Sequence, residues 1–120
     1  ISIWLGKREV RIMHIGRGHT AGDVIAVVPD AGVVFSGDLV EYKSACYCGD
    51  AHFTDWSSTL GNLAELQAKA LVPGRGAALA TPDLVKEGIE LTTDFISTLY
   101  SSIQDSVAKG RKSSLRYSGF

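Results

Sequence analysis

Hydrophobic and polar residues in the first third of the chain follow strand patterns. Over residues 9–15 apolar and polar side chains alternate with a period of two, which is typical of a half-buried strand. Residues 23–29 and 32–38 are apolar runs rich in β-branched side chains, which favour strands covered on both faces. The letters PDAG between these runs indicate a turn, so the pair is predicted to form a hairpin.

Two helical patterns follow an aperiodic loop over residues 41–54. In residues 55–70 apolar side chains recur at helical spacing, with Asp55 predicted as the N-cap. Residues 81–110 carry apolar side chains at steps of three, four or seven, with Thr81 as the N-cap. A short strand between the helices leads into a glycine-proline turn. The order β-β-β-α-β-α predicts an α/β (α+β) fold, a mixed β-sheet with two helices packed on it.

Composition excludes several classes of partner. The 120 residues are 45% hydrophobic, enough for one domain or part of one with a core of its own. No apolar run approaches the roughly 20 residues of a membrane span, so no membrane partner is expected. Residues 109–120 form a basic C-terminal tail without acidic side chains. Such a short tail is usually solvated, and we expect no nucleic-acid partner.

The ends and the cysteines say little about the compartment. The chain lacks an initiating Met and starts inside a strand pattern, so we expect it to be a piece of a longer protein, with its localisation left open. Cys46 and Cys48 are one residue apart, too close for an ordinary structural disulfide.

Glycines before the second apolar run do not form a dinucleotide site. Gly16, Gly18 and Gly22 are spaced G-x-G-x-x-x-G, one residue too long for that fingerprint. A strand pattern follows them, so no helix N-terminus is available to hold a pyrophosphate. A G-x-S-x-G nucleophile elbow is also absent.

Hairpin geometry predicts a cluster of chemically active side chains at one rim of the sheet. If the turn lies at residues 30–32, Asp38 emerges beside the loop that holds His19 and Asp23. A neighbouring strand would bring residues 73–76 to the same rim. Imidazole and carboxylate together suit zinc or iron, and glycines let the backbone approach closely.

Each of these residues also has a purely structural interpretation. His19 can be a turn histidine bonded to backbone, and Asp23 can bond to its own turn. Asp38 can cap a turn, and Arg75 can brace one. His52, in the aperiodic loop, is compatible with either role.

Three segments together resemble the metallo-β-lactamase-fold hydrolases. They are GRGHTAGDVIAVVPDAGVVFSGDLV, DWSSTLGNLAEL and LVPGRGAAL. In that family a G-H-T-x-G-D segment supplies a metal-binding histidine, a later G-D supplies an aspartate that bridges two metals, and a P-G-H-G turn supplies a last histidine. The resemblance runs from Val10 to about Leu99 and looks closest to members associated with quinoprotein systems.

The resemblance implies that residues 1–108 are the C-terminal half of an αββα metallo-β-lactamase-like domain. Carried over by position, His19 would be a ligand of the first metal and Asp38 the bridging carboxylate. The residues implied around these ligands, in the supporting loop or the pocket, are Thr20, Asp23, Gly74, Arg75 and Gly76.

Two departures from the family pattern limit what the chain can do alone. The H-x-H-x-D-H motif is absent, and Arg75 stands at the position of the last histidine, where a guanidinium has no lone pair for a metal. A hydrolytic zinc site has about three protein ligands. His19 and Asp38 make two, and His52 would be a third only if its loop folds inward.

The resemblance therefore implies a parent enzyme and an incomplete chain. The parent would use one or two zinc ions, with iron or manganese as alternatives, to activate water against a small-molecule ester, lactone, thioester or amide. This chain alone is expected to be inactive and could hold no metal, with the missing N-terminal half-domain or a second copy as its partner. The alternative is a non-catalytic half-domain that associates through an exposed sheet face.

Overall fold

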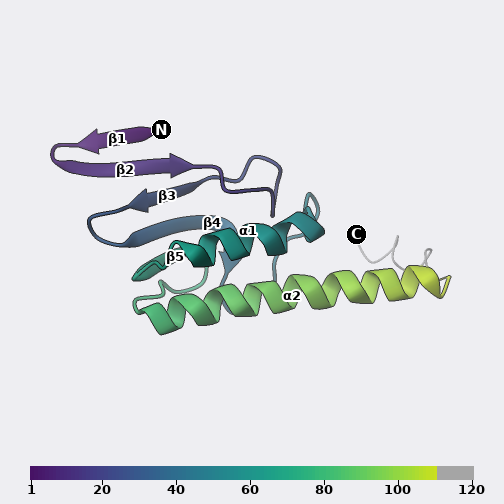
Figure 1. The fold of residues 1–120 in the computed structure, drawn as a ribbon. Helices are drawn as coiled ribbons and strands as arrows, with labels where there is room; N and C mark the ends of the chain where they lie inside the picture. The colour runs from purple at the N-terminus through teal and green to yellow at the C-terminus, as the bar shows by residue number, and fades with distance from the viewer. Residues whose placement is uncertain (111–120) are drawn as a thin grey trace.

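The computed structural model describes residues 1–110, which form a five-stranded mixed sheet and two helices (Figure 1). In chain order the elements are β1 (Ser2–Leu5), β2 (Arg8–Met13), β3 (Ile25–Val28), β4 (Val33–Glu41), α1 (Phe53–Glu65), β5 (Ala70–Arg75) and α2 (Pro82–Ala108). The predicted fold class, a mixed sheet with two helices, is confirmed.

The strands lie across the sheet in chain order, from β1 to β5. β1 to β4 are antiparallel neighbours, whereas β5 runs parallel to β4. A parallel pair needs a crossover connection, and α1 supplies it. The predicted hairpin is β3–β4, in which Val28 pairs with Val33 and Ala26 with Phe35.

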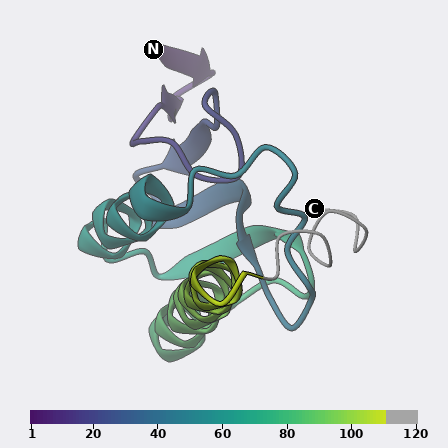
Figure 2. The same ribbon diagram turned by 90° about the vertical axis from the view of Figure 1, so that its right-hand side faces the viewer.

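Both helices cover the same face of the sheet (Figure 2). The core between the layers consists of strand residues and of the apolar stripes of the helices: Ile25, Val34, Leu39, Val40, Tyr42, Trp56, Leu60, Leu63, Ala68, Leu71, Leu79, Val85, Ile89 and Ile96. The prediction that strands are covered on both faces is wrong within residues 1–110. Phe35, which alternates with the buried Val34, is 46% exposed because no described element packs on its face.

The strand pattern of residues 9–15 corresponds to β2, and a further strand, β1, precedes it. β1 pairs with β2 through a turn at Gly6, so the sequence-based element order lacked one strand. β2 ends at Met13, before the alternating pattern ends. His14 is exposed, and its Nδ1 lies 2.7 Å from the Asp23 carbonyl oxygen.

Helix α1 begins earlier than its sequence pattern predicts. Its N-cap is His52, whose backbone N–H donates to the Gly18 carbonyl at 2.8 Å and so fixes the chain at that point. The Asp55 cap prediction is wrong, because Asp55 lies inside the first turn and pairs with Arg17. Ala70 belongs to β5 rather than to α1.

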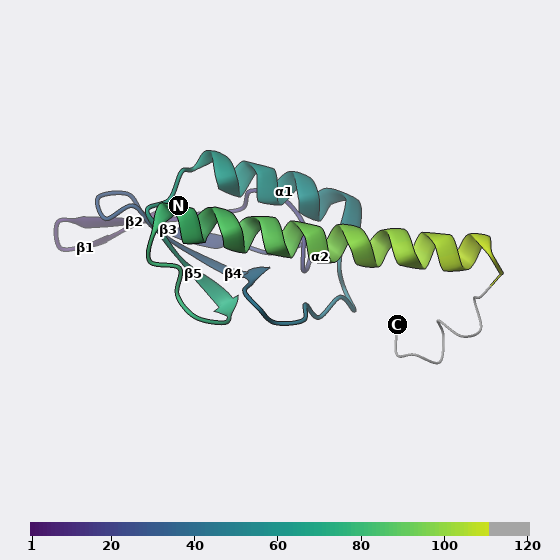
Figure 3. The same cartoon turned by 90° about the horizontal axis from the view of Figure 1, so that it is seen from below.

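Helix α2 follows the local rules that predict its start. The Thr81 hydroxyl accepts from the Leu84 N–H at 3.2 Å, and Pro82 occupies the first turn, where its missing N–H costs nothing. α2 extends well beyond the sheet (Figure 3). Neither helix has the length and apolarity that crossing a membrane requires. Of the predicted basic tail, residues 111–120 lie outside the described residues.

Candidate metal centre

The loop that carries His19 is held by its own hydrogen bonds. The Asp23 carboxylate accepts from the Thr20 N–H at 2.8 Å and from the Thr20 hydroxyl at 2.9 Å. The Gly18 N–H donates to the Thr20 carbonyl at 3.0 Å. Asp23 and Thr20 thus build the turn that presents His19.

The same loop is anchored to α1. The Thr59 hydroxyl donates to the Arg17 carbonyl at 2.6 Å, and a Cβ on Gly18 would lie 2.6 Å from Leu39 Cδ2. The His19 ring lies 6.0 Å from the rings of Trp56 and Tyr47, edge-on to the first and tilted to the second. These contacts define the position of the imidazole, whose side chain is 15% exposed.

Asp38 lies at an irregular part of β4. The β4–β5 register shifts between Phe35 and Gly37 and again before Glu41, and Gly37 has a φ of 55°. Such irregularities re-aim the side chains that follow them. Gly74 of β5 packs directly on this bend, because a Cβ there would lie 2.7 Å from the Gly37 carbonyl carbon.

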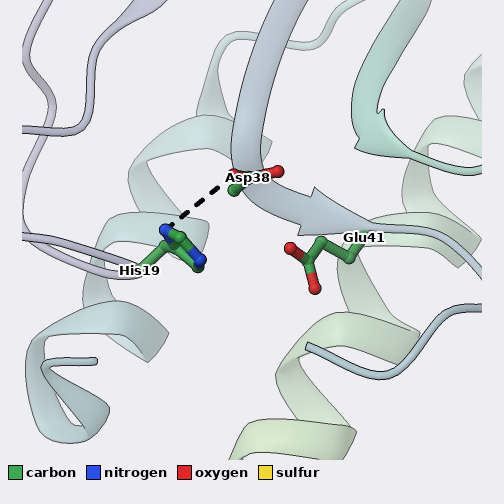
Figure 4. Close-up of side chains that lie close together, drawn as sticks. All are labelled: His19, Asp38 and Glu41. Carbon is green, nitrogen blue, oxygen red and sulfur yellow. Dashed lines mark ion pairs between the residues drawn. The ribbon is translucent and has the colours of Figure 1, made fainter. Parts of the chain in front are cut away.

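Three donors converge where the loop before β3 meets the last residues of β4 (Figure 4). His19, Asp38 and Glu41 each offer one ligand atom, and these atoms all lie within 4.8 Å of one another. His19 Nδ1 is 4.0 Å from Asp38 Oδ2. The Asp38 side chain is 41% exposed, so the group opens to solvent on that side.

Glu41 is the member that the sequence analysis missed. Its side chain is fully buried, and neither carboxylate oxygen has a hydrogen-bond partner within residues 1–110. The sequence held one signal: a glutamate directly after the apolar Leu39–Val40 pair, at the end of a buried run. The sequence pattern predicts that a loop begins at residue 41, whereas Glu41 is the last residue of β4.

Burial raises the pKa of the Glu41 carboxyl above its ordinary value, and the nearby Asp38 carboxylate adds to that rise. The Cys46 thiol, His19 and Arg75 oppose it. Burial and the Glu41 carboxylate also raise the pKa of Cys46 to about 12. Since the thiolate is the reactive form, Cys46 is a poor nucleophile at neutral pH.

The remaining predicted residues surround the group without joining it. Arg75 Nε lies 4.0 Å from Glu41 Oε1, but its side chain is 59% exposed. Gly76, with a φ of 94°, packs against the Tyr42 backbone. His52 is the N-cap of α1 and is not part of the three-donor group, so its ligand role stays a prediction.

The donors present fit a divalent metal. One imidazole and two carboxylates are ligand types that zinc accepts, and iron and manganese accept them as well. A buried carboxylate without partners is costly unless it is paired or coordinates a metal. The unpartnered oxygens of Glu41 are therefore the observation on which this fit rests.

Comparisons with known proteins agree with this fold. The chain is 26% identical over 70 residues to a metallo-β-lactamase type 2 of Pseudomonas aeruginosa, covering 58% of this chain and 28% of that protein. It is 29% identical over 92 residues to the type 2 enzyme of Bacillus cereus, covering 68% and 36%. The crystal structure of metallo-β-lactamase IND-7 matches with a TM-score of 0.69 and 25% identity, over 81% of this chain and 44% of that one. No family model matches.

Fold and donor group together define an α/β layer with a candidate metal centre at the end of its central strands. The chain has the fold of the metallo-β-lactamases and is similar to them in sequence over part of its length. It spans 28% and 36% of the length of the two curated relatives named above, and less than half of the IND-7 chain.

Proposed function

We propose that this chain is the C-terminal portion of a metal-dependent, zinc-type hydrolase of the metallo-β-lactamase superfamily. The observation that carries the proposal is the convergence of His19 and Asp38 from separate loops within this fold, with ligand atoms 4.0 Å apart. The G-H-T-x-G-D and G-D motifs of the sequence point to the same two residues. The relatives' names associate the same fold with β-lactam hydrolysis in those proteins.

The chain's own residues would hold and orient the metal. His19 is fixed by the Thr20–Asp23 turn and by Trp56, and Asp38 by the bend that Gly74 covers. A bound zinc ion would supply activation of water and stabilisation of negative charge on an ester, lactone, thioester or amide carbonyl. The exposed side of Asp38 is where a small-molecule substrate would approach.

The face of the sheet opposite the helices supports the proposed partner. Ile12, Ala26, Phe35 and Val72 pair in register across β2 to β5 and form one apolar row. Phe35 is 46% exposed in it. An apolar face of this kind would be covered by the N-terminal half-domain that carries the remaining ligands, and we expect the chain alone to be inactive.

The hydrolase proposal is tested on the natural protein that contains this chain. We expect its intact mass to exceed that of this 120-residue chain, with near-stoichiometric zinc and hydrolysis of at least one member of an ester, lactone, thioester and amide panel. In that protein His19→Ala should lose metal, whereas His14→Ala, outside the donor group, should retain it. A natural product of this length without metal or activity would refute the proposal.

The same apolar row favours a second candidate, a non-catalytic domain that associates with its own copies. Light scattering on the isolated chain distinguishes the two. A dimer that is lost with Phe35→Asp but retained with Leu66→Asp, on the helix side and 38% exposed, would support self-association. A monomer in both cases would leave only the hydrolase proposal.

A further inference from the structure

Glu41 carries an inference of its own, because nothing in the described residues explains why a carboxylate is buried at this position. The side chain has no exposed surface, and both oxygens lack a hydrogen-bond donor. Buried carboxylates in proteins are normally paired, hydrogen-bonded or bound to a metal.

Arg75 does not provide the missing partner. Its Nε is 4.0 Å from Oε1, beyond hydrogen-bonding distance, and the guanidinium is mostly in solvent. Among the described residues the second oxygen, Oε2, also has no hydrogen-bond partner, and the nearby Cys46 thiol, a weak donor, makes no bond of ordinary geometry to the carboxylate. The pair is therefore a loose contact at the edge of the group, and the carboxylate is held facing His19 and Asp38 without a bond to either.

The backbone of β4 explains how two carboxylates of one strand come to share a site. Residues three apart in a regular strand point to opposite faces, so Asp38 and Glu41 would normally diverge. The register shift between Gly37 and Glu41, with the positive φ of Gly37, changes this alternation. A regular pleat would point one carboxylate away from the three-donor group, whereas this irregular strand turns both carboxylates toward it.

We propose that Glu41 is a metal ligand, which completes with His19 and Asp38 a three-donor site for one divalent cation within this chain. The inference rests on the proposed function for the identity of the metal, zinc. It departs from the family-based expectation in taking a carboxylate of β4, rather than His52 or the turn after β5, as the third donor. Arg75 then lies beside the ligand Glu41 without contacting the metal itself.

The test measures metal binding by the isolated chain, without any assay of activity. The chain is stripped of metal with a chelator and titrated with Co²⁺ by absorption spectroscopy, then with Zn²⁺ against a chromophoric chelator. We expect one equivalent to bind. Glu41→Gln keeps the shape but loses the charge and should weaken binding at least tenfold, as His19→Ala should. Glu90→Gln, an exposed glutamate of α2, is the matched control and should bind as the wild type does.

The outcomes separate this inference from the hydrolase proposal. Loss of binding in His19→Ala but not in Glu41→Gln would overturn the ligand role of Glu41 and leave the hydrolase proposal standing. Absence of metal binding by the wild-type chain would also overturn the ligand role of Glu41, because three donors should suffice to bind the metal. The hydrolase proposal would remain, since it is tested separately on the natural protein. If Glu41→Gln does not fold, the wild-type chain decides: on addition of Zn²⁺ the Glu41 carboxyl ¹³C resonance should shift and that of Glu65 should not. An unshifted Glu41 resonance would refute the proposal.

Discussion

The β1 edge of the sheet and the β4–β5 region on its other side differ in how much of their surface the rest of the molecule covers. Every residue of β1 is exposed, whereas Leu39 and Val40 of β4 are completely buried under the helices. All three donor residues belong to the covered side of the molecule or to the loop docked on it. A site that depends on positions within fractions of an ångström needs neighbours that fix its backbone, and the β4–β5 region with the helix packed beside it offers them.

Each of the chain's two tryptophans lies in one of these regions, Trp56 in the covered one and Trp4 in the exposed one. Their substitution should give the largest difference in the free energy of unfolding. Trp56 is fully buried and donates from Nε1 to the Leu39 carbonyl at 3.0 Å, whereas Trp4 is 61% exposed. Trp56→Ala should lower the free energy of unfolding by about 3–5 kcal/mol. Trp4→Ala should change it by less than about 0.5 kcal/mol. Urea unfolding monitored by circular dichroism measures both, and equal losses would contradict the comparison.

Local patterns predicted those features that depend on neighbours in the sequence. Thr81 caps α2 because a hydroxyl three residues before an N–H is a local arrangement. The register of a hairpin follows from the position of its turn, so the sequence predicts that Asp38 lies beside His19, as it does in the structure. These are the parts of the fold and site for which chain neighbours decide the geometry.

The features that sequence patterns missed depend on contacts distant in the chain. Asp55 resembles an N-cap, but the hydrogen bond between His52 and Gly18 fixes an earlier helix start. Glu41 looks like a loop residue until the helices bury it and the bend in β4 turns it toward His19. Burial and strand irregularity follow from tertiary packing, which no local period encodes.

The bend in β4 can be tested through the glycine that covers it. A Cβ on Gly74 would lie 2.7 Å from the Gly37 carbonyl carbon and 2.8 Å from the Asp38 nitrogen, both backbone atoms that cannot easily move. Gly74→Ala should therefore cost about 1–3 kcal/mol of stability and weaken metal binding.

Gly61→Ala is the matched control, since no atom lies within 4 Å of the new Cβ. That change should stabilise α1 by up to about 1 kcal/mol, through helix propensity. Thermal unfolding that shows the reverse order would refute the packing role of Gly74.

Two aspartates test whether the loop of His19 is more tightly held than the exposed edge. Asp23 accepts two hydrogen bonds from Thr20, whereas Asp30 faces Arg8 across an exposed contact of 3.3 Å. Asp23→Ala should cost about 1–2 kcal/mol, because it leaves a partly buried N–H without its acceptor. Asp30→Ala should cost no more than about 1 kcal/mol. Amide hydrogen exchange of the Thr20 N–H provides a local check: unchanged protection in Asp23→Ala would show that the turn does not depend on this carboxylate.

The smallest expected effect is the pH dependence of stability that two glutamates cause. It has opposite signs in the two regions, because the pKa of Glu9 is lowered and that of Glu41 is raised. In the exposed region, hydrogen bonds from Arg11 and then Ser2 lower the pKa of Glu9, so its contribution to stability is present at neutral pH and is lost as the pH falls through its folded pKa. Burial raises the pKa of Glu41, so the folded chain keeps a proton that the unfolded chain releases. The free energy of unfolding of the metal-free chain should therefore fall as the pH rises from the ordinary glutamate range through the folded pKa of Glu41.

Carboxyl ¹³C titration of the metal-free chain measures both glutamates in one sample. Glu41 should titrate above its ordinary pKa, and Glu9 below. In urea unfolding across the same pH range, Glu41→Gln should remove the fall in stability with rising pH, because an amide has no proton to release. Glu9→Gln should retain that fall and remove only the loss at low pH. A pKa of Glu41 at or below that of Glu9 would mean that the Glu41 carboxylate has a stabilising partner in solution. The contrast between the covered and the exposed region would then not hold for their carboxyl groups.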